Sequence, residues 1–280
     1  MSTVDHVKDK VVVVTGAGGG FGGRVSRKAA ARGARLVCAD RDAATVQATV
    51  DAITAQGGDA IAVPTDVTSI ADMQALAAAA VARHGRIDVM INNAGVMPLA
   101  FFADHAAALS AWHACIDINF KGVLNGMVAV HDQMIAQGRG HVINVSSIYG
   151  NFPVAGAAVY GATKAAVNVL SESLRVESRG RIKVTTIKPT GVPGTGLGAG
   201  VVNRAAVVGI VGQNLPENLE TRTAYVEGRI DPARLDPEQP GYVFLDPDYI
   251  ADAMMHAIDQ PWGVSIGEIT VRAMGDHFLL

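Results

Sequence analysis

The sequence has little of several residue types that define other classes of protein. Only two of its 280 residues are cysteines, and Cys38 and Cys115 lack the spacing of a metal site or a disulfide framework. We therefore expect both to be packed thiols. Charged residues make up 18% of the chain and the formal net charge is -3, so no basic field exists to hold nucleic acid or an anionic membrane. The composition predicts that neither is a partner.

Two further absences concern location and metal chemistry. No apolar run is long enough to span a bilayer, and the polar residues 1–10 lack the apolar core of a signal peptide. We expect a cytoplasmic protein. The eight histidines show no zinc-binding signature, because His105 and His113 are too widely spaced to form an i, i+4 pair of ligands. The sequence predicts no metal site.

What the chain does contain is a regular alternation of β-branched runs and helix-forming stretches. Hydrophobic residues make up 49% of the sequence, which is enough for one large α/β domain with a buried sheet. Strands and helices alternate from end to end, without an internal repeat or a linker. This order predicts a single domain over residues 1–280, a Rossmann-like, doubly wound parallel sheet of about seven strands.

The first strand leads into a glycine-rich turn. Residues 11–14 are all valine, residues 15–22 read Thr-Gly-Ala-Gly-Gly-Gly-Phe-Gly, and residues 24–32 have helix-forming composition. This order lets bare backbone amides approach a pyrophosphate at a helix N-terminus. Two glycine registers overlap, GxGxxG from Gly18 and TGxxxGxG from Thr15. We prefer the second because the turn must begin where the strand ends, and it predicts a cofactor site that contains Gly16, Gly20, Phe21 and Gly22.

The second strand, residues 35–39, ends at Asp40, about twenty residues past the glycine turn. A carboxylate there can accept both hydroxyls of the adenosine ribose and would repel a 2'-phosphate, so NAD is the predicted cofactor. Arg41 leaves NADP open, since a basic residue at this place can contact a 2'-phosphate. Asp40 would otherwise serve as a helix N-cap, but Asp42 can fill that role.

Three residues near the middle of the chain suggest chemistry on an alcohol. The apolar strand at residues 141–146 ends beside Ser147, whose hydroxyl can be offered at the strand's carboxyl end. Tyr160 and Lys164 are four residues apart and share one face if this segment is a helix. A nearby ammonium favours phenolate and should lower the tyrosine pKa from about 10, which makes Tyr160 a predicted acid/base. Such a pair alone is weak evidence for catalysis, because tyrosines and lysines also share helix faces by chance.

A long amphipathic helix should precede that strand. Its apolar residues recur at three- and four-residue steps, and Asn119 falls on the same face. A buried amide needs hydrogen-bond partners, so Asn119 is either a structural bracket or part of a polar network. The predicted apolar face consists of Trp112, Ile116, Phe120, Val123, Met127, Val130 and Met134.

Together these motifs resemble the short-chain dehydrogenase/reductase family. The resemblance rests on the TGxxxGxG turn, on Asn-Asn-Ala-Gly at residues 92–95 and on the Ser, Tyr and Lys segment. It implies a proton relay of Asn119, Ser147, Tyr160 and Lys164. It also implies cofactor contacts beyond the glycine turn and Asp40, namely Asp66, Val67, Asn93, Ala94, Gly95, Tyr160, Lys164 and Val192. A homodimer or homotetramer is implied by the resemblance as well.

The chain departs from the family pattern after the sixth strand. The family has Pro-Gly, then Val or Ile, then Thr two residues on. Here Thr190 replaces the Gly and Gly194 stands at the Thr position, while Val192 still aligns. The sequence therefore leaves undecided which side chain makes the cofactor contact of the family's Thr, and Thr195 is a possible substitute for it.

Residues 193–246 change character, with glycine hinges and an apolar run at residues 201–211. A long segment of this kind predicts a substrate lid. Because Arg204 is the one charge within the run, we expect an apolar substrate, aromatic or alicyclic, held by burial. The alternative is that the run packs against the core or another subunit.

The predicted function is NAD-dependent interconversion of a secondary alcohol and a ketone, with a small molecule as the partner. One alternative is an NADH-dependent carbonyl reductase that works mainly in the reducing direction. Another is a non-catalytic NAD-sensing protein on the same fold, although all four relay residues are present. A nucleotide-sugar epimerase of the extended branch is disfavoured by the spacing of Gly16, Gly20 and Gly22.

Overall fold

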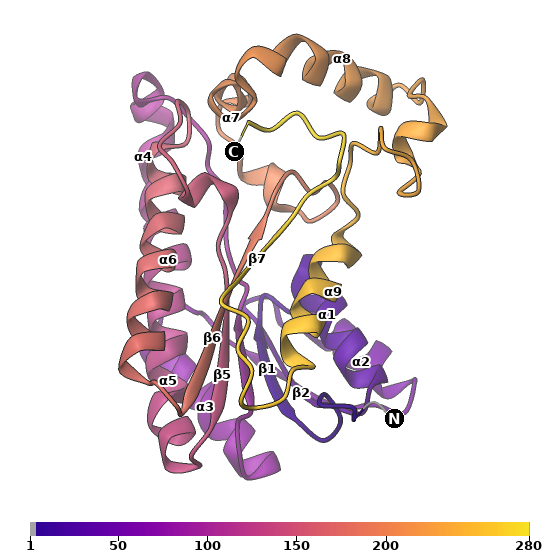
Figure 1. The fold of residues 1–280 in the computed structure, drawn as a ribbon. Helices are drawn as coiled ribbons and strands as arrows, with labels where there is room; N and C mark the ends of the chain where they lie inside the picture. Colours follow the sequence, from indigo (N-terminus) through magenta and orange to yellow (C-terminus); the bar gives the residue numbers. More distant parts are fainter. Residues whose placement is uncertain (1–3, 280) are drawn as a thin grey trace.

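The computed structural model describes residues 4–279, which form one α/β domain with a seven-stranded parallel sheet (Figure 1). The strands are β1 (Val11–Thr15), β2 (Arg35–Asp40), β3 (Asp59–Pro64), β4 (Val89–Asn92), β5 (Gly140–Val145), β6 (Ile182–Pro189) and β7 (Glu268–Val271). The helices are α1 (Gly20–Ala31), α2 (Ala43–Thr54), α3 (Ile70–His84), α4 (His105–Cys115), α5 (Gly122–Ala136), α6 (Ala158–Glu177), α7 (Val208–Val211), α8 (Leu215–Val226) and α9 (Pro247–Ile258). The predicted fold class is confirmed.

The sheet has the order β3-β2-β1-β4-β5-β6-β7 and every neighbouring pair is parallel. The chain starts in the middle at β1, builds outward to β3, and then returns to place β4 on the other side of β1. Ligands bind at such a switch point, outside the carboxyl ends of the two strands. The fold therefore directs attention to the loops that follow β1 and β4.

Alternating side chains on each strand build two cores, one on each face of the sheet. Val12 and Val14 of β1 pack with α1, α2 and α9, whereas Val13 between them packs with α3, α5 and α6. Figure 1 shows these two helical layers on opposite sides of the strands. The strands read as continuous β-branched runs because both of their faces are buried.

The long helix that was expected around Asn119 is interrupted by a π-helical turn, Ile116–Lys121, between α4 and α5. The extra residue in this turn rotates the buried face, so Cys115 is fully buried while Ile116 is exposed. The predicted apolar face was therefore wrong at Ile116, although Trp112, Val123, Met127, Val130 and Met134 are buried. Asn119 lies within the π-helical turn and is fully buried.

Residues 190–246 form the connection between β6 and α9, which we call the β6–α9 connection. It contains α7 and α8 and several short 3-10 turns, and it lies above the carboxyl ends of the strands (Figure 1). The last strand, β7, is short and begins at Glu268.

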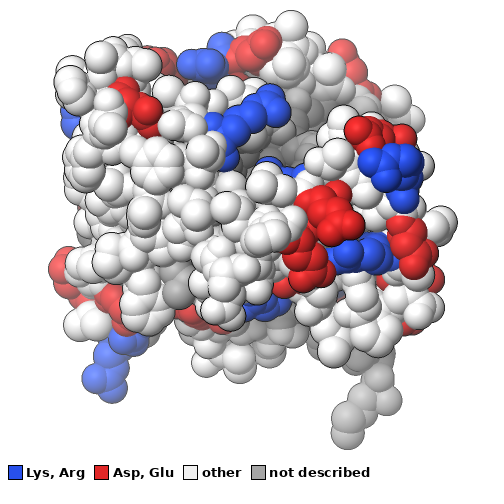
Figure 2. Space-filling view, turned by 90° about the horizontal axis from the view of Figure 1, so that it is seen from above, with Lys and Arg blue, Asp and Glu red and all other residues white. Residues whose placement is uncertain are grey.

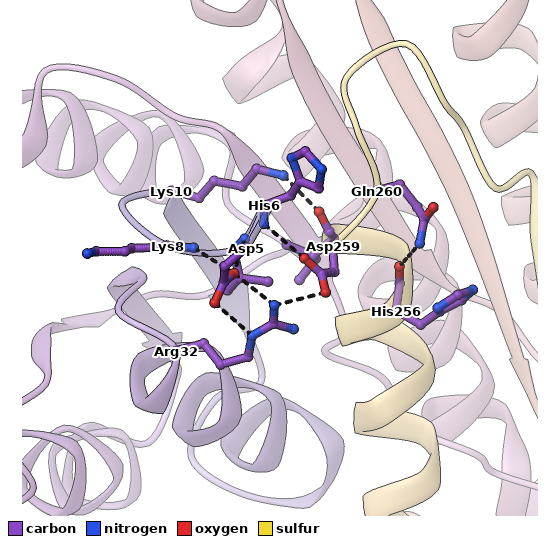
Figure 3. Close-up of polar contacts among 10 residues, drawn as sticks. Asp5, His6, Lys8, Lys10, Arg32, His256, Asp259 and Gln260 are labelled. Atoms are coloured by element: carbon purple, nitrogen blue, oxygen red, sulfur yellow. Dashed lines mark hydrogen bonds and ion pairs between the residues drawn. The ribbon is translucent and has the colours of Figure 1, made fainter. Parts of the chain in front are cut away.

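At the amino end of β1, the preceding residues form hydrogen bonds and ion pairs with residues at the ends of α1 and α9 (Figure 3). Arg32, which follows α1, donates to Asp5 and to Asp259, and the backbone N–H of His6 also donates to Asp259. The Lys10 ammonium donates to the carbonyl of Ile258 at 2.8 Å. These contacts join the residues before β1 to the ends of α1 and α9. No helix within residues 4–279 combines the length and apolarity that a bilayer crossing requires.

Candidate active site at the carboxyl ends of the strands

The turn after β1 is a tight cradle that only glycine permits. Gly16 has φ +66°, and a Cβ on Gly22 would lie 2.3 Å from the carbonyl oxygen of Gly16. Helix α1 begins at Gly20, so its first free N–H groups point out of this turn. The three glycines of the preferred register therefore shape a site that fits a pyrophosphate.

The loop after β4 is pinned to this turn. The Asn93 amide donates to the carbonyl oxygens of Thr15 and Gly16 at 2.9 and 3.2 Å. The backbone N–H groups of Asn93 and Ala94 both donate to the Thr15 hydroxyl, at 3.0 and 3.3 Å. Thr15 thus joins the two strand ends at the switch point, a role that the sequence did not reveal.

Asp40 lies at the end of β2, next to the glycine turn. Its carboxylate accepts a hydrogen bond from the backbone N–H of Gly18 at 3.0 Å. Asp42, as expected, caps α2 by accepting from Ala44 and Thr45. The Asp40 carboxylate is therefore not needed as a cap, and Arg41 beside it is exposed.

Asp66 and Val67, two of the cofactor contacts that the resemblance implies, follow β3. Asp66 is exposed and its carboxylate accepts from the backbone N–H and the hydroxyl of Thr68. Val67 is buried, and its carbonyl oxygen accepts from the Asn125 amide at 2.9 Å. Asp66 is thus held in a local turn, while Val67 is held against α5.

Ser147, Tyr160 and Lys164 meet at the end of β5. All three are buried, with exposed fractions of 5%, 3% and 4%. Helix α6 approaches the turn after β5 closely because Gly161 has no side chain, since a Cβ there would lie 2.9 Å from the Tyr149 carbonyl oxygen. The Ser147 hydroxyl accepts a hydrogen bond from the backbone N–H of Tyr149 at 3.3 Å and is close enough to the Tyr160 phenol to affect its pKa.

Lys164 is held by the end of the strand. Its ammonium donates to the carbonyl oxygen of Val145 at 2.8 Å and lies 5.8 Å from the centre of the Tyr160 ring. The i, i+4 spacing therefore brings the two side chains to one buried place, as predicted. The contact with Val145 could not be inferred from the helix alone.

Burial sets the protonation of both groups. It raises the pKa of Tyr160 above its usual value of 10, and the hydrogen bond with Ser147 only partly opposes this. Burial also lowers the pKa of Lys164 to about 8. The expected lowering of the tyrosine pKa by Lys164 is not found in this structure, because burial dominates and the Lys164 ammonium donates to Val145.

Asn119 acts as a bracket. Its side-chain oxygen accepts from the backbone N–H of Val96 at 2.9 Å, and its amide nitrogen donates to the Val96 carbonyl at 2.8 Å. The same nitrogen lies 3.4 Å from the hydroxyl of Thr163, which donates to the Tyr160 carbonyl at 2.7 Å. A Cβ on Gly95 would lie 3.2 Å from the Asn119 oxygen and 3.7 Å from the Lys164 nitrogen, so both groups flank this glycine.

The segment after β6 passes over the glycine turn. Val192 is half-buried and packs against the core. Thr195 follows two residues after Pro193, and a Cβ on Gly20 would lie 3.3 Å from its carbonyl oxygen. The Thr195 hydroxyl donates to the Val192 carbonyl at 3.5 Å.

An apolar cover closes over Tyr160. The apolar run of residues 201–211 packs here through Ala206, Ile210 and Val211, together with Ile148 and Tyr149. Tyr149 stands edge-on to Tyr160, with ring centres 5.4 Å apart. Phe152, which follows the turn after β5, is exposed. Part of the cover comes from residues after β7, which sequence patterns did not point to.

The histidines and acidic residues do not gather into a metal site. In the part of the chain that the structure describes, no group of three or more His, Cys, Asp or Glu side chains is placed to hold an ion. Both cysteines are buried, and burial raises the pKa of each thiol.

Comparisons with known proteins agree with this architecture. The family model for short chain dehydrogenases matches residues 10–205. An uncharacterized oxidoreductase of Listeria monocytogenes is 37% identical over 268 residues, which is 95% of this chain and 96% of the relative. A metagenomic short-chain oxidoreductase in complex with NADP is 30% identical, with TM-score 0.71 and coverage of 95% of this chain and 98% of that one. A short-chain dehydrogenase/reductase from Burkholderia phymatum in complex with NAD is 28% identical, with TM-score 0.74 and coverage of 95% and 90%.

Proposed function

The chain is an oxidoreductase of the short-chain dehydrogenase family, and from this premise we propose that it interconverts a secondary alcohol and a ketone with NAD as its cofactor. The observation that carries the proposal is the buried meeting of Ser147, Tyr160 and Lys164 beside the glycine turn at the switch point. A hydroxyl, a phenol and an amine at one place suit proton transfer to or from a substrate oxygen.

Each residue has a separate task in this proposal. Ser147 donates a hydrogen bond to the substrate oxygen and steadies it. Tyr160 exchanges the hydroxyl proton with that oxygen. Lys164, whose nitrogen lies 5.8 Å from the centre of the Tyr160 ring, would hold the nicotinamide ribose and replenish the proton. Asn119 keeps the Val96 loop in place and would link the relay to solvent.

The nicotinamide, when bound, supplies the carbon that accepts or donates hydride. The glycine turn fits the pyrophosphate of the dinucleotide, because a side chain at Gly16, Gly20 or Gly22 would crowd neighbouring parts of the protein. We assign Phe21 to the same turn, and Val67, Asn93, Ala94, Gly95 and Val192 to the remaining cofactor contacts, with Asp66 at the adenine. Asp40 favours NAD because its carboxylate would repel a 2'-phosphate.

A second candidate is the reduction of a ketone, since the raised pKa of Tyr160 keeps on the phenol the proton that this reaction needs. A phenol that keeps its proton at neutral pH can donate it to the oxygen of a ketone. In the oxidising direction the same group must first lose that proton. The pKa of Tyr160 therefore affects the rate of each direction at a given pH, whereas the net direction follows from the concentrations of substrate, product and the two forms of the cofactor.

We propose an apolar substrate. The surroundings of Tyr160 are Ile148, Tyr149 and the apolar run of the β6–α9 connection, which acts as a lid in this proposal. Seen from above in Figure 2, most of the surface on this side is uncharged and the basic and acidic groups are interspersed. Burial of apolar substrate surface contributes about 25 cal/mol per Å².

The experiment is a direct assay. Purified protein, NAD and a panel of secondary alcohols are mixed, and NADH absorbance is followed; the reverse assay uses NADH and ketones. Tyr160→Phe should lower kcat by about 10² to 10⁴ fold, because it removes the exchanging proton and little volume. Binding of NADH should stay nearly intact. Tyr249→Phe, a change of the same kind on the outside of α9, is the control, and a Tyr160→Phe enzyme with most of its kcat would place the acid/base elsewhere.

A further inference from the structure

The residues after β7 return to the active-site end of the molecule. In Figure 1 the yellow trace that follows β7 runs to α7 and α8. A buried Asp276 carboxylate fixes its path, because it accepts from Arg272 at 2.8 Å and from the backbone N–H of Phe278 at 3.1 Å. The Arg272 guanidinium also donates to the Phe278 carbonyl at 2.8 Å. We call residues 272–279 the returning segment.

His277 anchors the returning segment to α8. It is buried, and one ring nitrogen lies 3.3 Å from the amide of Asn218 while the other lies 3.3 Å from Glu217. The amide of Asn214 donates to the His277 carbonyl at 3.1 Å. The backbone N–H of Leu279 donates to the Ile210 carbonyl at 2.9 Å. The segment is therefore fastened to the lid on both sides of Phe278.

This anchoring places the Phe278 ring between Gly191 and the apolar cluster that contains Tyr160. On one side the ring touches Gly191, where a Cβ would lie only 2.2 Å from its edge, immediately before Val192. On the other side it packs against the apolar cluster that contains Tyr160, Ile148 and Ile210. The Phe278 ring therefore lies between Gly191, the neighbour of Val192, and the apolar cluster that contains Tyr160.

We infer that Phe278 forms a wall of the substrate site and determines the size of the alcohol or ketone that the enzyme accepts. This inference rests on the proposed function, which it deepens. Discrimination by an apolar pocket amounts to about 10- to 200-fold for each methylene group, so the loss of a whole ring has a large effect on relative rates. Phe278 is a specificity-determining residue in this account and takes no part in proton transfer.

The test compares kcat/KM for 2-butanol, 2-octanol and 4-phenyl-2-butanol in the wild type, Phe278→Ala and Phe278→Leu. We expect the ratio of 4-phenyl-2-butanol to 2-butanol to rise at least 10-fold in Phe278→Ala and by less in Phe278→Leu, which keeps more of the apolar packing. Phe102→Ala, which removes an exposed ring beside Trp112, should leave the ratio as in the wild type.

The outcomes separate the two proposals. If the wild type is active and kcat/KM falls by the same factor for every substrate in both Phe278 variants, Phe278 is only structural and the inference is overturned. If Phe278→Ala does not fold, an unchanged ratio in Phe278→Leu overturns it equally. If the wild type turns over no alcohol or ketone although it binds NADH, the proposed function fails and the wall fails with it.

Discussion

At the scale of single residues, burial decides the charge of several groups. His141 in β5 is almost fully buried, and its Nε2 lies 2.8 Å from the Thr185 hydroxyl while no hydrogen-bond partner meets its Nδ1 in the described residues. Burial lowers its pKa well below 6.5, and the nearby Lys183 and Lys10 add to this. The folded protein therefore keeps His141 neutral under conditions in which the unfolded chain protonates it.

The consequence is a pH-dependent stability. Below pH 6.5 the unfolded state binds a proton that the folded state excludes, so the free energy of unfolding falls as the pH falls, by up to about 1.4 kcal/mol per pH unit. His141→Gln should show a flatter profile between pH 6.5 and 5 in urea unfolding. His256→Gln, at an exposed position on α9, is the control. Equal slopes in the wild type and His141→Gln would contradict this account.

Asp40 gives a second prediction at this scale. Asp40→Ala should narrow the ratio of NAD to NADP efficiency by at least 10-fold, because the repulsion of a 2'-phosphate is removed and Arg41 remains beside the site. Steady-state kcat/KM with each cofactor measures this. Asp42→Ala, which removes only the cap of α2, should keep the wild-type ratio. If both variants have the same ratio of kcat/KM with NAD to kcat/KM with NADP, Asp40 is not the residue that contacts the adenosine ribose.

At the scale of elements, the glycine turn can be tested within its own sequence. A Cβ on Gly22 would meet the Gly16 carbonyl oxygen at 2.3 Å and the Asn93 amide at 2.6 Å, whereas nothing lies within 4 Å of a Cβ on Gly19. Gly22→Ala should weaken NADH binding at least 10-fold and lower Tm, and Gly19→Ala should do neither. Fluorescence titration and thermal unfolding check both, and equal NADH affinities in the two variants would show that the turn is not the cradle.

The elements also show what the sequence could predict. The valine run of β1, the glycine turn and the Tyr160 and Lys164 pair are local patterns, and the structure places them as expected. The π-helical turn contains Asn119 instead, whose side chain makes two hydrogen bonds with Val96 in another loop. Periodicity within one helix contains no information about such a contact, so it predicts the wrong face for Ile116.

The same reasoning explains two features of the site that the sequence did not predict. The pKa of Tyr160 depends on desolvation by segments that are distant in sequence, including Ile210 and the residues around it. The path of Phe278 depends on Asp276, on α8 and on the absence of a side chain at Gly191. Spacing rules identify which residues share an element, but they do not show which segment covers it.

At the scale of the whole molecule, the outer surface of α5 and α6 is unusually apolar. Val128 on α5 and Val169 and Val176 on α6 have exposed fractions of 52%, 67% and 61%. Both helices cover the same face of the sheet, and their inner residues share one core (Figure 1). Exposed apolar residues on neighbouring helices are candidates for an interaction site. We propose that a second copy of the chain covers it, in a homodimer or homotetramer.

This proposal predicts the effect of a single charge. Val169→Glu places a carboxylate where the two copies would meet, and an unpaired charge buried at an interface costs several kcal/mol. We expect the wild type to sediment as a dimer or tetramer at micromolar concentration and Val169→Glu to shift toward the monomer with its Tm lowered. Val226→Glu on α8 introduces the same charge at a position that is 83% exposed, and should leave the assembly unchanged. A wild type that sediments as a monomer would show that α5 and α6 face solvent, and an assembly that Val169→Glu does not weaken would have to use another surface.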